Sequence, residues 1–349
     1  MTFWPLSLAR RFATLAIAAF GTAVFWSLAL PLPFLFGPMI ACLAAALLGA
    51  PLRGLDPAVT AARTALGVTV GASLTPALIG QLPSMAVSLA FIPFYILVIG
   101  LIGVPFFTRI CGFDRVTAYY SAMPGGLQDM VSFGQEAGGC VRTLALVHAT
   151  RLLVLVTLAP ILLTQVFGAP LTGPIGAPGT AIPPLQLALM AAAAYFGWKI
   201  ARRAGLFGAP ILGPMIAAAI LSLGGLLQSR PPAEAILAAQ FVLGIGMGVS
   251  YVGVTLSELR RVGAAGAAFV LILAGIASVF AEIVVQLGLA PPLEGFLAFS
   301  PGGQAEMTLL AILAGADLGF VVVHHLVRVL LVITCAPVAA RFLRLRRGA

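Results

Sequence analysis

Long apolar runs, separated by short segments that hold most of the polar residues, make up nearly the whole chain. The runs at 82–107 and 262–289 are almost entirely apolar, without polar residues at alternate positions, and, as helices, can cross a hydrocarbon core of roughly 30 Å. A membrane β-barrel would instead alternate apolar and polar positions. The pattern therefore predicts helices, and five crossings in each half fit it best: 11–30, 33–50, 58–79, 83–108 and 140–164, then 183–200, 209–228, 233–256, 263–289 and 318–340.

The composition agrees with a lipid environment. The 349 residues are 61% hydrophobic and only 8% charged, whereas soluble domains carry about 25% charged residues. The net charge of +9 is spread singly or in pairs over the ends of apolar runs. Cytoplasmic loops show this placement, so we interpret it as a topology signal and expect no direct nucleic-acid partner. The four cysteines are scattered, without a CxxC motif, and indicate neither a metal site nor a disulfide framework.

The two halves of the chain repeat one another. The first half contains Ala-Met-Pro-Gly-Gly-Leu-Gln-Asp-Met at 122–130, and the second contains Ser-Pro-Gly-Gly-Gln-Ala-Glu-Met at 300–307. An offset of 177 aligns these blocks and the His-x-x-Arg pairs downstream of them; the Gly-Pro-Met-Ile-Ala blocks at 37–41 and 213–217 align at an offset of 176. We therefore predict a first repeat at 1–164, a linker at 165–182 and a second repeat at 183–349.

The positive-inside rule orients these crossings. With a cytoplasmic N-terminus, ten alternating crossings place every basic cluster inside and leave only Arg230 on the wrong side. Because five is odd, the second repeat would be inverted relative to the first, as in many secondary transporters. The predicted fold is an all-α polytopic membrane protein of two inverted repeats with Pro-Gly-Gly-broken helices at 113–137 and 295–314. Whether those broken helices cross or re-enter stays open. We expect a bacterial inner membrane and cytoplasmic termini.

The candidate chemistry lies around the two Pro-Gly-Gly breaks. Asp129 and Glu306 each follow a break proline by five residues, and an acidic group inside a membrane costs about 2.5 kcal/mol or more. A transport role competes with the interpretation that each carboxylate caps the short helix after its break. The break glycines allow close approach to a ligand, and the following helix N-terminus attracts anions; a packing turn is the alternative. The break residues concerned are Ser121, Pro124, Gly125, Gly126, Ser300, Pro301, Gly302 and Gly303.

A histidine and an arginine, three residues apart, lie within an apolar run of each repeat. The pairs are His148 with Arg151 and His325 with Arg328. A buried arginine needs a carboxylate, a backbone carbonyl or an anionic ligand. One interpretation is an ion pair with Asp129 or Glu306 that pins the broken helix. The other is a substrate-coordinating or proton-coupled site. His324 has no counterpart in the first repeat and is interpreted as incidental, and the Gly-x3-Gly pairs at 67–71 and 244–248 as helix-packing faces.

With these motifs, nearly the whole chain resembles the AbrB family of duplicated membrane proteins of Gram-negative bacteria, which is distinct from the soluble DNA-binding regulator of similar name. The resemblance rests on both Pro-Gly-Gly blocks with their acidic residues and on the two His-x-x-Arg helices. Members are often labelled ammonia monooxygenase or regulator of gene expression. The chain contains no HExxH motif and no phosphate-binding loop, so we expect neither an enzyme nor an ATP-driven pump.

Three functions are compared on this basis. The leading hypothesis is a secondary transporter or exporter of a small anionic or zwitterionic solute that acts without a cofactor. Whether protons or sodium ions drive the transport stays open, and assembly into a homo-oligomer is compatible with this hypothesis. The first rival is a membrane protein that regulates gene expression indirectly or through a partner, with the basic tail at 341–347 as a binding segment. The second rival, a membrane enzyme, would need a metal.

Overall fold

The computed structural model describes residues 4–343, except 31, 170, 172–176 and 207. All regular secondary structure in this part of the chain is helical. The ten long helices follow the ten predicted apolar runs within a few residues at most ends. Their bounds are α1 Trp4–Ser27, α2 Pro33–Leu47, α3 Asp56–Gly71, α4 Pro76–Pro105, α7 Val141–Gln165, α8 Pro184–Arg203, α9 Ala209–Leu223, α10 Ala233–Val249, α12 Ala264–Gln286 and α15 Leu318–Phe342.

Shorter elements complete the fold. A π-helical turn, Phe106–Ile110, continues α4, and a second one, Leu259–Gly263, joins the three-residue α11, Leu256–Glu258, to α12. A single 3-10 turn, Gly179–Ala181, precedes α8. The four short helices at the two breaks are α5 Arg115–Ala122, α6 Leu127–Glu136, α13 Pro292–Phe299 and α14 Gln304–Ala314.

Five helical spans of the described residues are long and apolar enough to cross a membrane, by length and composition. They are Leu8–Ser27, Leu78–Ile110, Val141–Gln165, Leu256–Gln286 and Leu318–Phe342. Three further apolar helices, α2, α9 and α10, are only 15 to 17 residues long, or about 22 to 26 Å at 1.5 Å per residue. The predicted class, an all-helical membrane protein, is confirmed at this level, while the count of ten crossings stays a prediction.

The chain forms two compact units, and neither coincides with a sequence repeat. The first unit consists of residues 1–76 and 174–256, and the second of residues 77–173 and 257–349. Each repeat thus contributes its first three long helices to the first unit and its remaining helices to the second. Part of the predicted linker at 165–182 lies outside the described residues. The end of the predicted basic tail, from residue 344 onward, lies outside them as well.

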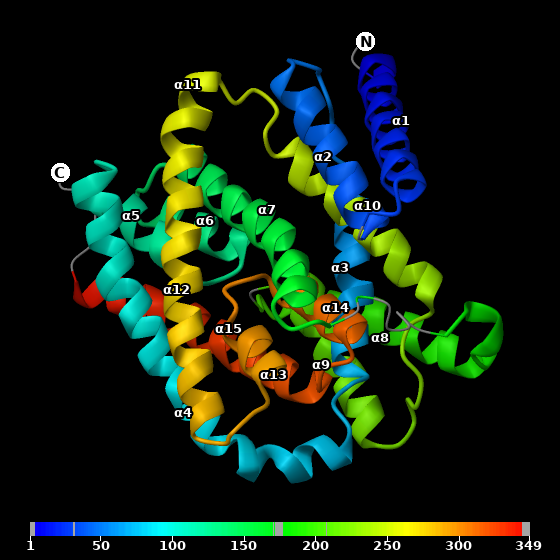
Figure 1. The fold of residues 1–349 in the computed structure, drawn as a ribbon. Helices are drawn as coiled ribbons and strands as arrows, with labels where there is room; N and C mark the ends of the chain where they lie inside the picture. Colours follow the sequence, from blue (N-terminus) through cyan, green and yellow to red (C-terminus); the bar gives the residue numbers. More distant parts are fainter. Residues whose placement is uncertain (1–3, 31, 170, 172–176, 207, 344–349) are drawn as a thin grey trace. The chain divides into compact units, whose positions relative to one another are not determined.

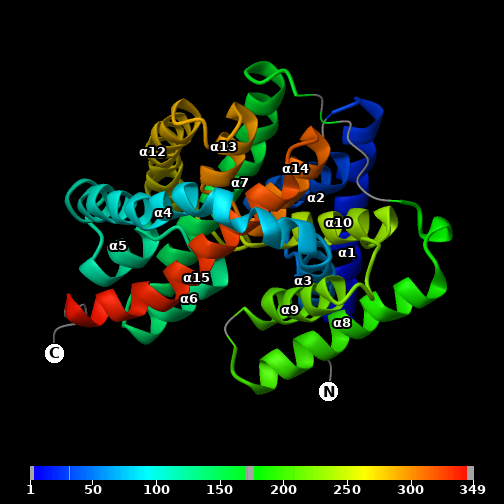
Figure 2. The same cartoon turned by 90° about the horizontal axis from the view of Figure 1, so that it is seen from below.

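In the first unit, glycines bring helices of the two repeats together. Helix α3 packs against α9, and α10 packs against α2 (Figures 1 and 2). A Cβ at Gly67 would collide with the carbonyl of Ile211, and one at Gly244 with the carbonyl of Leu35. These positions correspond under the repeat offsets, so each repeat presents the same glycine to the other. The predicted packing role of the Gly-x3-Gly pairs is confirmed.

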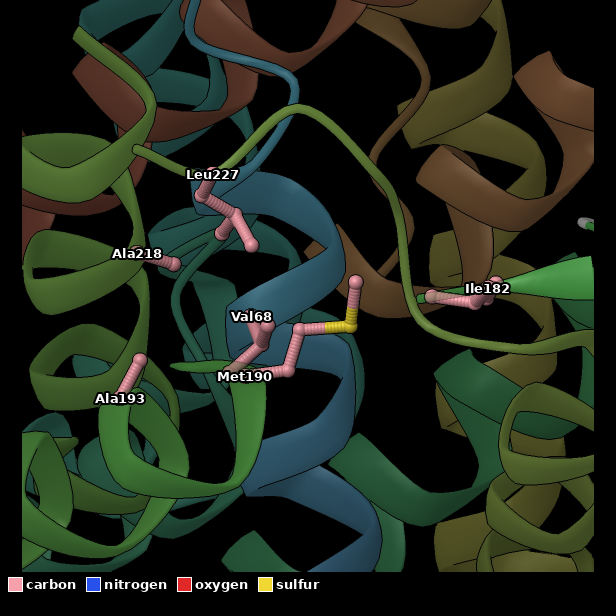
Figure 3. Close-up of a cluster of buried hydrophobic side chains, with 6 residues drawn as sticks. All are labelled: Val68, Ile182, Met190, Ala193, Ala218 and Leu227. Carbon is pink, nitrogen blue, oxygen red and sulfur yellow. The ribbon is translucent and has the colours of Figure 1, made fainter. Parts of the chain in front are cut away.

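Small and medium apolar side chains fill the core between α3, α8 and α9 (Figure 3). Met190 on α8 extends toward Val68 on α3, and Ala193 and Ala218 allow α8 and α9 to approach closely. Helices α8 and α9 also meet at Gly197 and Gly213, where either Cβ would collide with the backbone of the other helix. Small residues are the usual means of close helix packing in membranes, where lipid tails compete for apolar contacts.

In the second unit, aromatic side chains join α4 and the π-helical turn that continues it to α12. The ring of Phe269 on α12 lies 4.7 Å from that of Phe107, and Phe280 lies 5.4 Å from Tyr95. Helix α12 also packs against α7 and α13, while α15 packs against α13 and α14. Two of the few acidic residues begin helices here: Asp114 accepts from the amide of Thr117, and Asp317 accepts from the amides of Gly319 and Phe320. All four short helices at the breaks belong to this unit.

Candidate functional site

Each Pro-Gly-Gly block separates two short helices, and the local sequence explains why. The residues before the prolines, Met123 and Ser300, have ψ angles of 132° and 130°, which end α5 and α13. A proline disfavours the α conformation in the preceding residue and cannot donate a backbone hydrogen bond. Helices α6 and α14 begin after Gly126 and Gly303, whose ψ angles are 145° and 149°. The backbone groups of each break therefore need partners from elsewhere.

The two arginines provide those partners. Arg151 donates from Nη1 to the carbonyl of Met123 (3.1 Å) and from Nη2 to that of Gly125 (2.6 Å). Arg328 donates in the same way to the carbonyls of Ser300 (2.6 Å) and Gly302 (2.7 Å). Both side chains are only 2% exposed. Of the three partners considered for a buried arginine, the structure thus places backbone carbonyls against both guanidiniums.

The histidines bind the helix that precedes each break. His148 Nε2 lies 3.0 Å from the carbonyl of Tyr120, near the end of α5, and His325 Nε2 lies 2.8 Å from that of Leu297, near the end of α13. Because a carbonyl only accepts, Nε2 is the protonated nitrogen in both rings. The contacts of histidine and arginine obey the 177-residue offset, so the two breaks are held by the same construction.

The carboxylates lie back over the glycines that begin their own helices. Asp129 and Glu306 are the third residues of α6 and α14, and a Cβ at Gly126 or Gly303 would collide with the respective carboxylate. Both side chains are half-buried. A carboxylate at this position can accept from the amide at the helix start. The geometry therefore agrees with the capping interpretation, and only glycine leaves room for it.

The two breaks are electrostatically coupled. The charge of Arg328 and that of Glu306, which belong to the second repeat, both act on Arg151 of the first. Helix α14 also contacts α7, which carries Arg151. The structure thus brings Arg151, Arg328 and Glu306 into one neighbourhood of the second unit. Carbonyl oxygens stabilise the two guanidiniums but do not cancel their positive charge, and Glu306 supplies one opposite charge in the same neighbourhood.

The two break serines differ in their partners. The hydroxyl of Ser300 donates to the carbonyl of Phe296 at 2.7 Å. The hydroxyl of Ser121 is completely buried and has no hydrogen-bond partner among the described residues. The prolines and the first glycine of each break are also buried, and Gly125 and Gly302 lie against the side chains of Met130 and Met307. The two break serines are therefore not equivalent in their hydrogen bonds.

Sequence analysis missed two buried polar contacts of α4. The hydroxyl of Tyr95 donates to the carbonyl of Phe299 at 2.7 Å, next to the second break. His324, interpreted as incidental, is 1% exposed, and its ring nitrogens contact the carbonyl of Phe320 (2.8 Å) and the hydroxyl of Ser88 (2.9 Å). Tyr95 and Ser88 are two of the few polar residues in the apolar run of α4, so the sequence could have indicated that they are special. It could not have indicated their partners, which lie more than 200 residues away.

Comparison with known proteins places these motifs in a family. The model of the family described as "Transition state regulatory protein AbrB" matches residues 34–344, which include both breaks and both His-x-x-Arg helices. "Uncharacterized protein YhjN" of Bacillus subtilis (strain 168) is 30% identical over 253 residues, covering 67% of this chain and 65% of that protein. "Putative regulator AbrB" of Escherichia coli (strain K12) is 24% identical over 335 residues, covering 91% of this chain and 92% of that protein.

Proposed function

Because this chain belongs to the AbrB family, whose match includes both helix breaks, we propose that it is a secondary transporter or exporter of a small anionic or zwitterionic solute. It acts without a cofactor and is not an enzyme. The solute binds in the second unit, at the two Pro-Gly-Gly breaks. The residues assigned to binding are Ser121, Pro124, Gly125, Gly126, Asp129, His148, Arg151, Ser300, Pro301, Gly302, Gly303, Glu306, His325 and Arg328.

The observation that carries the proposal is the pair of equivalent arginine clamps. Arg151 and Arg328 each donate from both Nη groups to carbonyls of a helix break. The buried Nε of each arginine has no hydrogen-bond partner among the described residues. Broken helices at matching positions of two halves are the best pointer to a transport site. A purely structural turn would not require two interacting positive charges in an apolar interior.

The proposed anion preference follows from the local charges. Two guanidiniums interact in this neighbourhood, and the helices α6 and α14 direct their positive ends to the breaks. Asp129 and Glu306 lie over the glycines that begin α6 and α14, which leaves one carboxylate at each break. We therefore propose that a carboxylate of the solute binds the guanidiniums, whereas a cation binds only at the two carboxylates. Protons or sodium ions bound at Asp129 and Glu306 are the proposed coupling ions.

The proposed topology supports alternating access. Ten crossings with a cytoplasmic N-terminus place both termini in the cytoplasm of a bacterial cell and invert the second repeat relative to the first. The partners are the lipid bilayer of the inner membrane and the transported solute, without direct nucleic-acid binding. Assembly into a homo-oligomer is compatible with this arrangement.

The second candidate function is indirect regulation of gene expression. The name of the Escherichia coli relative, "Putative regulator AbrB", favours it. A regulatory role would act through a partner protein, with the basic tail at 341–347 as one binding segment. Deleting that tail discriminates between the two functions, because a regulator loses its effect while a transporter still transports.

Solute uptake into proteoliposomes tests the leading proposal. The test variants are Arg151→Ala and the double change Asp129→Asn with Glu306→Gln, which removes charge and keeps side-chain size. The matched control is Arg142→Ala on the same helix, since Arg142 is exposed and bonded to Glu258. We expect uptake of at least one organic acid, a loss of tenfold or more in the test variants, and a change below twofold in the control. Failure of every organic acid to move, or full uptake by the test variants, would refute the proposal.

A further inference from the structure

The two breaks are equivalent in sequence but unequal in their hydrogen bonds. In the second repeat, Arg328 Nη2 donates to His325 Nδ1 at 2.9 Å in addition to the carbonyl of Gly302. In the first repeat, His148 Nδ1 has no hydrogen-bond partner among the described residues. Both ring nitrogens of His325 therefore form hydrogen bonds within the protein, whereas only one ring nitrogen of His148 does so among the described residues.

The tautomer of His148 makes its unpaired nitrogen an acceptor. Its Nε2–H donates to the carbonyl of Tyr120, so a neutral ring carries a lone pair on Nδ1. A protonated ring would place a second positive charge next to Arg151 in a fully buried position, which is unfavourable. His325 shows the same tautomer directly, because its Nδ1 accepts from an arginine.

A hydroxyl adds to this difference. Ser121 is 0% exposed and its Oγ is unpaired among the described residues, while the equivalent position of the second repeat is Ala298. The first break thus combines an acceptor at His148 Nδ1, a donor at Arg151 Nε and a hydroxyl that can serve as either. The second break offers only Arg328 Nε from the same three positions. Buried polar atoms are rarely left unpaired in native proteins.

From this asymmetry we infer that the first break recognises the solute and that the solute carries a hydrogen-bond donor beside its carboxylate, as a 2-amino or 2-hydroxy acid does. This inference rests on the proposed transport function. The carboxylate binds the Nε–H of the arginines, and the N–H or O–H of the solute donates to His148 Nδ1 or to Ser121. A plain carboxylate or an inorganic anion leaves the histidine acceptor unpaired. The second break holds its own helices and completes the positive field.

Matched acids test the inference on the purified full-length protein. We propose to measure binding by isothermal titration for triplets of two to six carbons, each consisting of a carboxylic acid, its 2-hydroxy acid and its 2-amino acid. The expected result is that a hydroxy or amino acid binds at least tenfold more tightly than the plain acid of the same length. Equal or tighter binding of the plain acids, or no binding by any triplet, would overturn the inference.

Paired variants locate the preference. Ser121→Ala copies the residue of the second repeat, and His148→Gln keeps a donor for Tyr120 while replacing Nδ1 with an amide oxygen at a different position. Each should reduce the preference for hydroxy or amino acids at least threefold. The matching variants of the second break, Ser300→Ala and His325→Gln, should weaken the binding of plain and substituted acids alike and leave the ratio between them unchanged. If these variants abolish the preference and the first-break variants do not, the assignment to the first break is wrong.

A readout without solute separates this inference from the transport proposal. His325→Gln removes an acceptor of Arg328, so it should lower the melting temperature in detergent more than His148→Gln does. Equal shifts would contradict the asymmetry. Binding with the expected preference but no movement across proteoliposomes would refute transport alone, while transport of plain carboxylates or inorganic anions alone would refute only the inference about the solute.

Discussion

Adding one methyl group should destabilise the protein at one glycine of α10 and not at another two residues away. A Cβ at Gly248 would lie 2.6 Å from the carbonyl oxygen of Met39 and 2.6 Å from Cys42 Cβ, on the packed helix α2. A Cβ at Gly246 would meet only the side chain of Val59, at 3.5 Å. The two positions lie on one helix, two residues apart, so the same substitution probes packing at one and helix propensity at the other.

The magnitudes follow from these distances. Contacts of 2.6 Å must open by about 1 Å to reach ordinary van der Waals separation, and because one of them is with a backbone carbonyl, the overpacking should cost about 2–3 kcal/mol, the upper part of the usual range. Alanine recovers up to about 1 kcal/mol relative to glycine within a helix. Gly248→Ala should therefore lower the free energy of unfolding by about 1–2 kcal/mol. Gly246→Ala should leave it unchanged or raise it by up to about 1 kcal/mol.

Reversible unfolding by a denaturing detergent, with tryptophan fluorescence as the signal, measures both changes on the full chain. Thermal melting in a mild detergent gives an independent ranking of the two variants. Equal destabilisation by both substitutions would contradict the packing geometry, because Gly246 has room for the added carbon. A neutral Gly248→Ala would show that α2 and α10 do not approach as closely as the structure places them.

Other substitutions test the site and the helix ends. Arg328→Lys keeps the charge but cannot reproduce the guanidinium's hydrogen bonds to two carbonyls and to His325. The loss of one or two charge-assisted bonds should lower the free energy of unfolding by about 2–5 kcal/mol. The control Arg142→Lys, at an exposed ion pair, should lower it by less than about 1 kcal/mol. Asp317→Ala removes the acceptor for two amides at the start of α15 and should cost about 1 kcal/mol; a cost near zero would show that these bonds are absent. The hydrogen bond from Thr143 lowers the pKa of the Cys140 thiol, whereas burial raises the pKa of Cys111. Because the thiolate is the nucleophile, maleimide labelling of single-cysteine variants should reach half its maximal rate at a lower pH for Cys140; the reverse order would contradict the shifts.

Much of the helical architecture was predictable. The ten apolar runs correspond to ten long helices, because apolar length and the need to satisfy every backbone group leave little alternative to a helix. The packing role of Gly67 and Gly244 also followed from their spacing. The compact units were not predicted: the repeats are continuous in sequence, but α3 packs on α9 and α10 on α2, so each unit combines both repeats. Pairing between distant helices leaves no periodic signal within either one.

The site was predictable in its residues but not in its contacts. The breaks and the His-x-x-Arg pairs stood out because polar residues are rare in this chain. From the sequence, each arginine could take a carboxylate, a backbone carbonyl or an anionic ligand as its partner, with Asp129 and Glu306 as the ion-pair candidates; the structure gives both arginines carbonyls of the breaks. A proline and two glycines release those carbonyls only when the chain bends there, so the acceptors exist in the folded state alone. The roles of Tyr95 and His324 required the packing of α4 for the same reason.

The order of residues along this chain is enough to establish a membrane protein, its internal duplication and the short set of residues able to do chemistry. These properties depend on the hydrophobicity and local conformation of neighbouring residues, which the order of residues records directly. The tertiary structure decides which helices form each unit, which oxygen atoms accept from the arginines and which of the two equivalent motifs keeps more unpaired atoms among the described residues. Those properties depend on contacts between residues far apart in sequence. The two repeats differ, for example, in one hydrogen bond, because His325 Nδ1 accepts from Arg328 while His148 Nδ1 has no partner among the described residues. Such a difference arises only when the helices pack.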